Sequence, residues 1–187
     1  MEQAIGAIPF GMCALFPASL DIAREVAREA ASATGQVCQV ANINTGTQIV
    51  LSGHHDALEK AVQIAKSRRV RKAVRLEVGA PFHCSLLEPS QSLFVSALDQ
   101  VTFSPADAIV LSNVTGQALP LDDPSEMRQL LLRQLVEPVD WWKCLGTATE
   151  LGCVEFVEYG PSPPLFRSFV AQKSVDLQYT HASDVEL

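Results

Sequence analysis

The stretch VCQVANINTGTQIVLS, residues 37–52, decides the fold that the sequence predicts. Its two ends are rich in apolar and β-branched residues, and Asn44-Thr45-Gly46-Thr47 between them has the composition of a turn. We therefore expect strands at residues 37–43 and 48–52, joined as an antiparallel hairpin.

Amphipathic segments flank this hairpin on both sides. Before it, the apolar run 11–16 predicts a strand, and apolar residues at helical spacing predict a helix between Ser19 and Gly35. After it, helical spacing returns at residues 57–66, and the alternation at 72–78 predicts a fourth strand. The order strand, helix, strand, strand, helix, strand is the split βαβ, or ferredoxin-like, arrangement, which we assign to residues 6–79.

Residues 80–187 alternate helices with strands, which is typical of a parallel α/β sheet covered on both faces. Helices are expected at 85–101, 124–135, 139–151 and 165–172, and strands at 108–112, 154–159 and 174–179. The continuous apolar run 108–112 is typical of a strand buried on both faces. Because two or three strands make an incomplete sheet, we predict the C-terminal part of a larger α/β domain that carries the ferredoxin-like subdomain as an insert.

Composition and charge narrow the range of functions. The chain has 187 residues, of which 48% are hydrophobic and 19% charged, as in a soluble globular protein. No apolar run approaches the roughly 18–20 residues of a membrane span, and the first residues resemble neither a signal nor a transit peptide. The net charge of −7 disfavours nucleic acid as the main partner. Five cysteines without a C-x-x-C pair predict free thiols in a reducing intracellular compartment, with neither a disulfide framework nor a metal site.

One histidine is a candidate catalytic residue. The segment 79–84 places His83 at a strand-to-helix turn, where α/β proteins often carry working residues. Imidazole can accept and donate a proton near neutral pH, so His83 could be a general base. The local sequence alone slightly favours a buried histidine that anchors the turn. The neighbouring Cys84 is expected to be a semi-buried thiol, because adjacent side chains point apart.

Two amide residues are further candidates. Asn42 and Asn44 share one strand face. Their amides could hold a ligand carbonyl or carboxylate, or they could cap the hairpin turn. The turn role is favoured for Asn44, and both roles remain open for Asn42. Gln134 lies near a helix end, where carbonyls lack intrahelical partners and could fix the tautomer of an imidazole.

A basic cluster stands out in this acidic chain. It could bind phosphates or an acidic protein, or it could be the solvated end of a helix, and the two interpretations are close to even. The cluster consists of Lys66, Arg68, Arg69, Arg71 and Lys72. We expect His54 and His55 on the surface.

Together these segments resemble malonyl-CoA:acyl-carrier-protein transacylase, the acyltransferase of fatty-acid and polyketide synthesis. The matching segments follow the family's order and are NINTGTQIVLSG at 42–53, APFH at 80–83, LSNV at 111–114, RQLVEPVDW at 133–141 and EYGP at 158–161. The resemblance implies a hydrolase-like α/β core with an inserted ferredoxin-like subdomain. It also implies transfer of malonyl from malonyl-CoA, through a serine, to the phosphopantetheine thiol of acyl carrier protein, with no bound cofactor.

The resemblance assigns roles to three residues of this chain. His83 aligns with the catalytic base, Gln134 with the residue whose backbone carbonyl orients that base, and Asn42 with an asparagine that lines the acyl site. Phe82 before His83 favours malonyl over acetyl or methylmalonyl. The implied partners are acyl carrier protein and a coenzyme A thioester, in a bacterial cytoplasm or a mitochondrial or plastid matrix.

The chain also departs from the family's pattern. In the family, the serine lies in a Gly-His-Ser-x-Gly elbow and is followed by an arginine that pairs with malonyl. Both features precede the segment that residues 1–4 resemble. The chain has neither of them. In addition, the chain has PSPP at 161–164 after Gly160, in a segment where the family usually has a second glycine. We therefore expect a fragment that cannot transfer malonyl alone. A non-catalytic module that binds the carrier protein through the basic cluster is the alternative.

Overall fold

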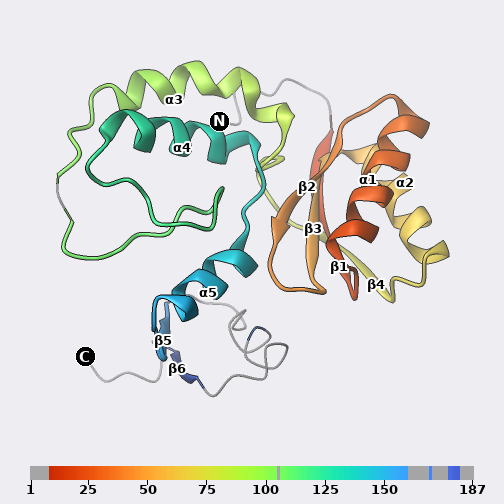
Figure 1. Cartoon of the computed structure of the whole chain (residues 1–187). Helices are drawn as coiled ribbons and strands as arrows, with labels where there is room; N and C mark the ends of the chain where they lie inside the picture. Colours follow the sequence, from red (N-terminus) through yellow and green to blue (C-terminus); the bar gives the residue numbers. More distant parts are fainter. Residues whose placement is uncertain (1–8, 105, 160–168, 170–176, 182–187) are drawn as a thin grey trace.

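A four-stranded antiparallel sheet with two helices forms the first part of the protein. The structure, a computed structural model, describes residues 9–104, 106–159, 169 and 177–181. The elements of this part are β1 (Phe10–Phe16), α1 (Leu20–Thr34), β2 (Cys38–Ile43), β3 (Ile49–His54), α2 (His55–Ser67) and β4 (Lys72–Leu76). The sheet order is β2-β3-β1-β4, and all neighbouring strands are antiparallel (Figure 1). The predicted order of strands and helices is therefore confirmed.

Local side-chain and backbone chemistry sets the ends of these elements. The Ser19 hydroxyl accepts a hydrogen bond from the Ile22 amide at 3.3 Å, and Gly35 ends α1 at a φ of 66°. In the hairpin turn, the buried Thr45 hydroxyl accepts from the amides of Thr47 and Gln48 at 3.2 and 2.9 Å. The turn thus satisfies its amides within the chain, as the composition of residues 44–47 predicts.

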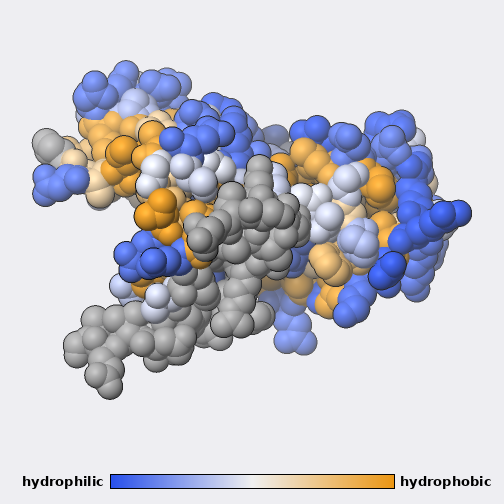
Figure 2. Space-filling view, turned by 60° about the horizontal axis from the view of Figure 1, so that its bottom comes forward, coloured by the Kyte–Doolittle hydropathy of each residue, from blue (hydrophilic) through white to orange (hydrophobic). Residues whose placement is uncertain are grey.

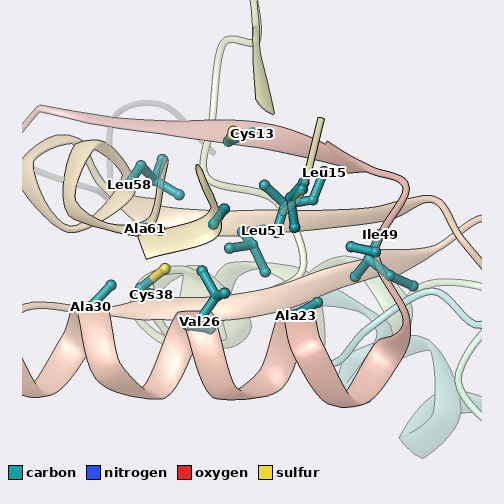
Figure 3. Close-up of a cluster of buried hydrophobic side chains, with 14 of the residues drawn as sticks. Cys13, Leu15, Ala23, Val26, Ala30, Cys38, Ile49, Leu51, Leu58 and Ala61 are labelled. Carbon is teal, nitrogen blue, oxygen red and sulfur yellow. The ribbon is translucent and has the colours of Figure 1, made fainter. Parts of the chain in front are cut away.

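One face of the sheet packs against α1 and α2 to form the main core. Small residues on the helices let them approach the sheet closely, and larger aliphatic side chains from the strands fill the space between (Figure 3). The buried residues labelled there are Cys13, Leu15, Ala23, Val26, Ala30, Cys38, Ile49, Leu51, Leu58 and Ala61.

The opposite face of the sheet is covered by the segment that follows β4. Met12 and Val50 are buried on this face, and Val78 and Phe82 pack against them. The apolar residues of the sheet therefore divide between two layers, and the second layer leads directly into His83.

The second part of the chain is mainly helical. A 3-10 helix, η2 (Ser85–Ser90), continues into α3 (Gln91–Leu98), and α4 (Pro124–Val136) and α5 (Trp141–Glu150) follow (Figure 1). The helix predicted at 85–101 is thus divided, with Pro89 inside the 3-10 part, because proline cannot donate an α-helical hydrogen bond. The helix predicted from residue 139 begins two residues later, at Trp141, and residues 138–140 form no helix.

The predicted strand at 108–112 is wrong. Its pairing is limited to an isolated bridge between Leu111 and Ala118, and Ile109 and Val110 are 64% and 43% exposed. A strand buried on both faces needs covering layers on both sides, and the described residues do not provide them here.

A short parallel pair follows α5. β5 (Glu155–Glu158) and β6 (Gln178–His181) are parallel neighbours, which agrees with the parallel sheet expected for this part. The predicted helix 165–172, apart from Phe169, the PSPP segment at 161–164 and the start of the last predicted strand lie outside the described residues. In the described part of the chain, no helix has both the length and the apolar character that crossing a bilayer requires.

Gly53 is predicted to be essential for the hairpin. It pairs with Cys38, and a methyl group at Gly53 would overlap the Val37 carbonyl oxygen and come within 2.9 Å of the Cys38 Cα. We expect Gly53→Ala to lower the free energy of unfolding by about 1–3 kcal/mol, measured by urea denaturation. Gly146→Ala is the control: its added methyl group meets no atom within 4 Å, so this helical site should gain up to about 1 kcal/mol. Equal stability of the two variants would contradict the prediction.

Candidate active site

His83 has an unusual backbone conformation. Its φ is 59°, in the left-handed region, which costs an L-residue roughly 1–2 kcal/mol. The residues after it hold the turn in place: the Cys84 thiol donates to the Pro81 carbonyl at 3.2 Å, and the Ser85 amide donates to Gln39 Oε1 at 2.8 Å. The sheet therefore fixes the direction in which the His83 side chain leaves the backbone.

The imidazole of His83 is hydrogen-bonded to α4. Its Nδ1 lies 2.7 Å from the Gln134 carbonyl oxygen. A carbonyl oxygen only accepts, so Nδ1 carries the proton and donates it. In the neutral ring, Nε2 then has a lone pair and can accept a proton.

The Gln134 carbonyl is free for this role because of the sequence that follows it. In a continuing helix, the amide of residue 138 would bond to this carbonyl, but residue 138 is a proline and has no amide proton. The last helical bond of α4 is made instead by the Glu137 amide to the Arg133 carbonyl, at 2.8 Å. His83 therefore satisfies a carbonyl that the helix leaves unpaired.

Asn42 lies on the sheet face that the His83 segment covers. The register of β2 against β3 shifts between Val40 and Asn42, so Ala41 is an extra residue in β2, and Asn42 lies opposite Val50. Val50 is buried on the face away from α1 and α2. Without the bulge, simple alternation from Val40, which packs against the α1 and α2 core, would direct Asn42 toward those helices.

The segment after Gln134 connects this strand to the histidine. The Ile43 amide donates to the Val139 carbonyl at 2.8 Å, and the Val139 amide donates to the Ala41 carbonyl at 2.9 Å. Gln134 contacts the His83 ring, and five residues later Val139 pairs with Asn42 in parallel. The structure thus joins His83 to Gln134 directly and ties Asn42 to the same segment.

The basic cluster lies at the other end of the sheet. Lys72, at the start of β4, pairs with Phe16, whereas Leu76, at the end that leads to His83, pairs with Met12. A strand of five residues spans about 13 Å, so the structure does not bring the cluster and His83 together. Arg68 of the cluster forms ion pairs with Glu25 and Glu29 of α1. Lys66, Arg69, Arg71 and Lys72 are exposed.

The five cysteines are free, and four of them are buried. Burial raises the pKa of Cys84, and its thiol contacts the Ser52 hydroxyl at 3.5 Å and the Pro81 carbonyl. A buried thiol with a raised pKa is a poor nucleophile. Cys84 is therefore part of the packing of the turn, as expected from its position beside His83.

One cluster of possible metal ligands lies outside this site. The ligand atoms of His55, Asp56 and Glu59 lie within 4.8 Å of one another. However, the Arg75 guanidinium contacts the His55 ring and lies 3.2 Å from Glu59, so a cation already faces this cluster. We therefore do not assign a metal site to this cluster.

The pairing of Val139 with β2 is not expected from the sequence, whose pattern predicts a helix at residue 139. A signal was present in Glu137-Pro138, since the residue before a proline is restricted to extended conformations; Glu137 has a ψ of 155°.

A hollow of about 490 Å³ lies between the hairpin turn and α5 and is lined among others by Thr45, Gly46 and Lys143. His83 is not among its lining residues.

Comparison with known proteins points to one class. No family model matches the chain. Malonyl CoA-acyl carrier protein transacylase of Salmonella typhimurium is 32% identical over 165 residues, which cover 88% of this chain and 52% of that protein. The transacylase of Bacillus subtilis is 29% identical, with 88% and 51% covered. The chain therefore spans about half the length of these curated relatives.

Solved structures give the same result. An acyl-carrier-protein S-malonyltransferase from Burkholderia pseudomallei superposes with a TM-score of 0.89 at 29% identity, over 99% of this chain and 59% of that chain. A malonyl-transacylase in complex with its holo type II PKS acyl-carrier protein is 24% identical, with a TM-score of 0.89 over 98% and 58%, and shows the same fold.

These matches place the chain in the class of transacylases. More specifically, it is a homologue of malonyl CoA-acyl carrier protein transacylase that covers about half of those proteins.

Pro138 is predicted to keep the Gln134 carbonyl available to His83. Pro138→Ala supplies an amide proton that can compete for this carbonyl, so the population of His83 with Nδ1–H hydrogen-bonded to it should fall, as measured by ¹⁵N NMR of the imidazole. Pro124→Ala, at the first turn of the same helix, is the matched control, because an added amide there has no competing role. An unchanged His83 spectrum in Pro138→Ala would contradict this account.

Proposed function

We propose that this chain is the histidine-bearing part of a malonyl-CoA:acyl-carrier-protein transacylase and that His83 is its general base. The observation that carries the proposal is the 2.7 Å bond from His83 Nδ1 to the Gln134 carbonyl, which leaves Nε2 as the proton acceptor. The proposed substrate is malonyl-CoA, the proposed acceptor is the phosphopantetheine thiol of acyl carrier protein, and no cofactor is needed.

In the proposed first half-reaction, a serine hydroxyl attacks the thioester carbonyl of malonyl-CoA. His83 Nε2 takes the hydroxyl proton as the new C–O bond forms, and it returns this proton to the sulfur of coenzyme A as the C–S bond breaks. In the second half-reaction, the carrier thiol gives its proton to Nε2 as its sulfur attacks the seryl ester and forms the new C–S bond; the C–O bond to serine then breaks, and the proton returns to the serine oxygen. The chain does not contain the Gly-His-Ser-x-Gly motif, so the serine comes from the part of the transacylase that this chain does not cover.

The position of the imidazole supports a cationic intermediate. When Nε2 takes a proton, the ring becomes an imidazolium, and its Nδ1–H bond to a carbonyl becomes a charge-assisted bond. The partner carbonyl belongs to the last turn of α4, where the helix dipole favours a positive charge. Asn42, tied to the same segment through Val139, is proposed to line the acyl site.

A single-chain chimera tests this function. We suggest joining the part of the Salmonella typhimurium transacylase outside the matched region to this chain and measuring malonyl transfer from malonyl-CoA to acyl carrier protein. His83→Ala in the chimera should lower kcat/KM by about 10²–10⁴-fold, because it removes general acid–base catalysis. His55→Ala, a substitution of a surface histidine, is the matched control and should leave transfer unchanged. Equal activity of the His83 and His55 variants would refute the assignment of the base.

A second candidate function is binding of acyl carrier protein without catalysis, through the basic cluster. The exposure of Lys66, Arg69, Arg71 and Lys72 on one end of the subdomain favours it, because a carrier with an acidic surface would be attracted there. The pairing of Arg68 with Glu25 and Glu29 reduces the charge available.

Charge reversal tests this second candidate. Arg69→Glu combined with Arg71→Glu should weaken binding of acyl carrier protein at low salt by about tenfold, measured by titration. Arg24→Glu with Arg28→Glu on α1 changes the net charge equally and serves as the control. If both pairs weaken binding to the same extent, the attraction depends on net charge and the basic cluster is not a binding site. Retention of full affinity in the first pair would equally exclude it.

A further inference from the structure

Two side chains of the sheet hold the residues that directly follow His83. The Ser52 hydroxyl donates to the Cys84 sulfur at 3.5 Å. The Ser85 amide donates to Gln39 Oε1 at 2.8 Å. Because His83 has a left-handed backbone conformation, which is unfavourable for an L-residue, the turn depends on contacts of this kind to keep its shape.

The register of the sheet explains why these two side chains act together. Gln39 of β2 lies opposite Ser52 of β3, and directly opposite residues project from the same face of a sheet. Asn42 lies opposite Val50, which shares this face with Ser52 because the two are alternate residues of β3. The extra residue at Ala41 therefore leaves Gln39 and Asn42 on one face, although they are three positions apart.

The amide that Gln39 binds has no partner in its own helix. Ser85 is the first residue of η2, and the first amides of a helix lack intrahelical acceptors. Cys84, at the N-cap position, makes no side-chain cap bond, so the acceptor comes from Gln39, which lies 46 positions earlier in the chain. This N–H to oxygen bond is stronger than the contact between Ser52 and Cys84, because sulfur is a weak acceptor.

The exposure of Gln39 separates positioning from core packing. Gln39 is exposed, whereas Ser52 and Cys84 are fully buried. Removal of the Gln39 carboxamide therefore creates no cavity, and its loss acts on the turn after His83 rather than on the hydrophobic core.

We propose that Gln39 is a positioning residue for His83. Its Oε1 holds the Ser85 amide, which keeps the backbone of the turn in place and thereby keeps Nδ1 of the ring on the Gln134 carbonyl. Gln39 acts on the reaction through the histidine alone. The inference deepens the proposed function, because any effect on malonyl transfer rests on His83 as the base, but the position of the ring is measured without that function.

Two substitutions in the full chain test this positioning. Gln39→Leu removes the acceptor, so hydrogen exchange of the Ser85 amide should become about fivefold faster or more. The population of His83 with Nδ1–H bonded to Gln134 should fall in the same variant, as measured by ¹⁵N NMR of the imidazole. Gln39→Glu keeps an acceptor oxygen at the same reach and should restore both values.

An exposed glutamine outside the site provides the control. Gln63 lies on α2, which packs on the face of the sheet opposite to the His83 segment. Figure 2 shows hydrophilic residues gathered over the end of the molecule that α1 and α2 form. Gln63→Leu makes the same chemical change there and should leave the Ser85 exchange rate and the His83 spectrum unchanged.

A double-mutant cycle in the single-chain chimera tests the path through the histidine. Gln39→Leu should lower kcat for malonyl transfer by about 3–10-fold with little change in KM, and Gln39→Glu should restore it. In a His83→Ala chimera, Gln39→Leu should lower the residual rate by less than about twofold, because the group that it positions is absent. An equal loss with and without His83 would show that Gln39 acts by another route and would overturn the inference.

The measurements on the chain alone separate this inference from the proposed function. Unchanged Ser85 exchange and an unchanged His83 spectrum in Gln39→Leu would overturn the positioning role, whether or not the chimera transfers malonyl. Equal effects of Gln39→Leu and Gln39→Glu would also overturn it, since the acceptor oxygen would then be irrelevant. The expected changes in the chain together with an inactive chimera would support the positioning role and count against the proposed activity.

Discussion

One hydrogen bond, between the turn around His83 and the end of α4, holds the imidazole at the place where chemistry is proposed. It joins the His83 Nδ1 to the Gln134 carbonyl, and it exists because Pro138 offers no amide to close the last turn of α4. The bond fixes the tautomer of the ring and therefore which nitrogen can accept a proton. The orientation of the imidazole, the end of α4 and the start of the segment that reaches β2 all depend on this arrangement.

The sheet contributes to the same site through its second face. α1 and α2 take up one face, and the other face receives Val78, Phe82 and the anchors of the turn around His83. The bulge at Ala41 places Asn42 on this second face, while Val40 remains in the main core. One irregular residue in β2 thus allows the strand to serve a hydrophobic core and to present an amide on the opposite side.

The sequence predicts the ferredoxin-like part well because its signals are local. Ser19, Gly35 and the turn at 44–47 each have a physical reason to end or reverse the chain, and the structure confirms them. Long-range pairing was harder to predict. Nothing near Arg68 in the sequence indicates Glu25 and Glu29 as its partners, and nothing near residue 139 indicates β2. The run 108–112 was predicted wrongly as a buried strand, because burial depends on neighbours that periodicity does not reveal. For the site, local residues indicated His83 and the helix end at Gln134, whereas their pairing followed only from the resemblance.

The contact between Val139 and β2 also affects self-association. β2 is an outer strand of the four-stranded sheet, and an outer strand presents unpaired amides and carbonyls that can recruit a strand from another molecule. Val139 occupies these groups at Ala41 and Ile43. At the other border, β4 carries the charged side chains of Lys72 and Arg75, which discourage stacking of copies. The segment that reaches from the histidine to the sheet therefore also protects the sheet from aggregation along its border.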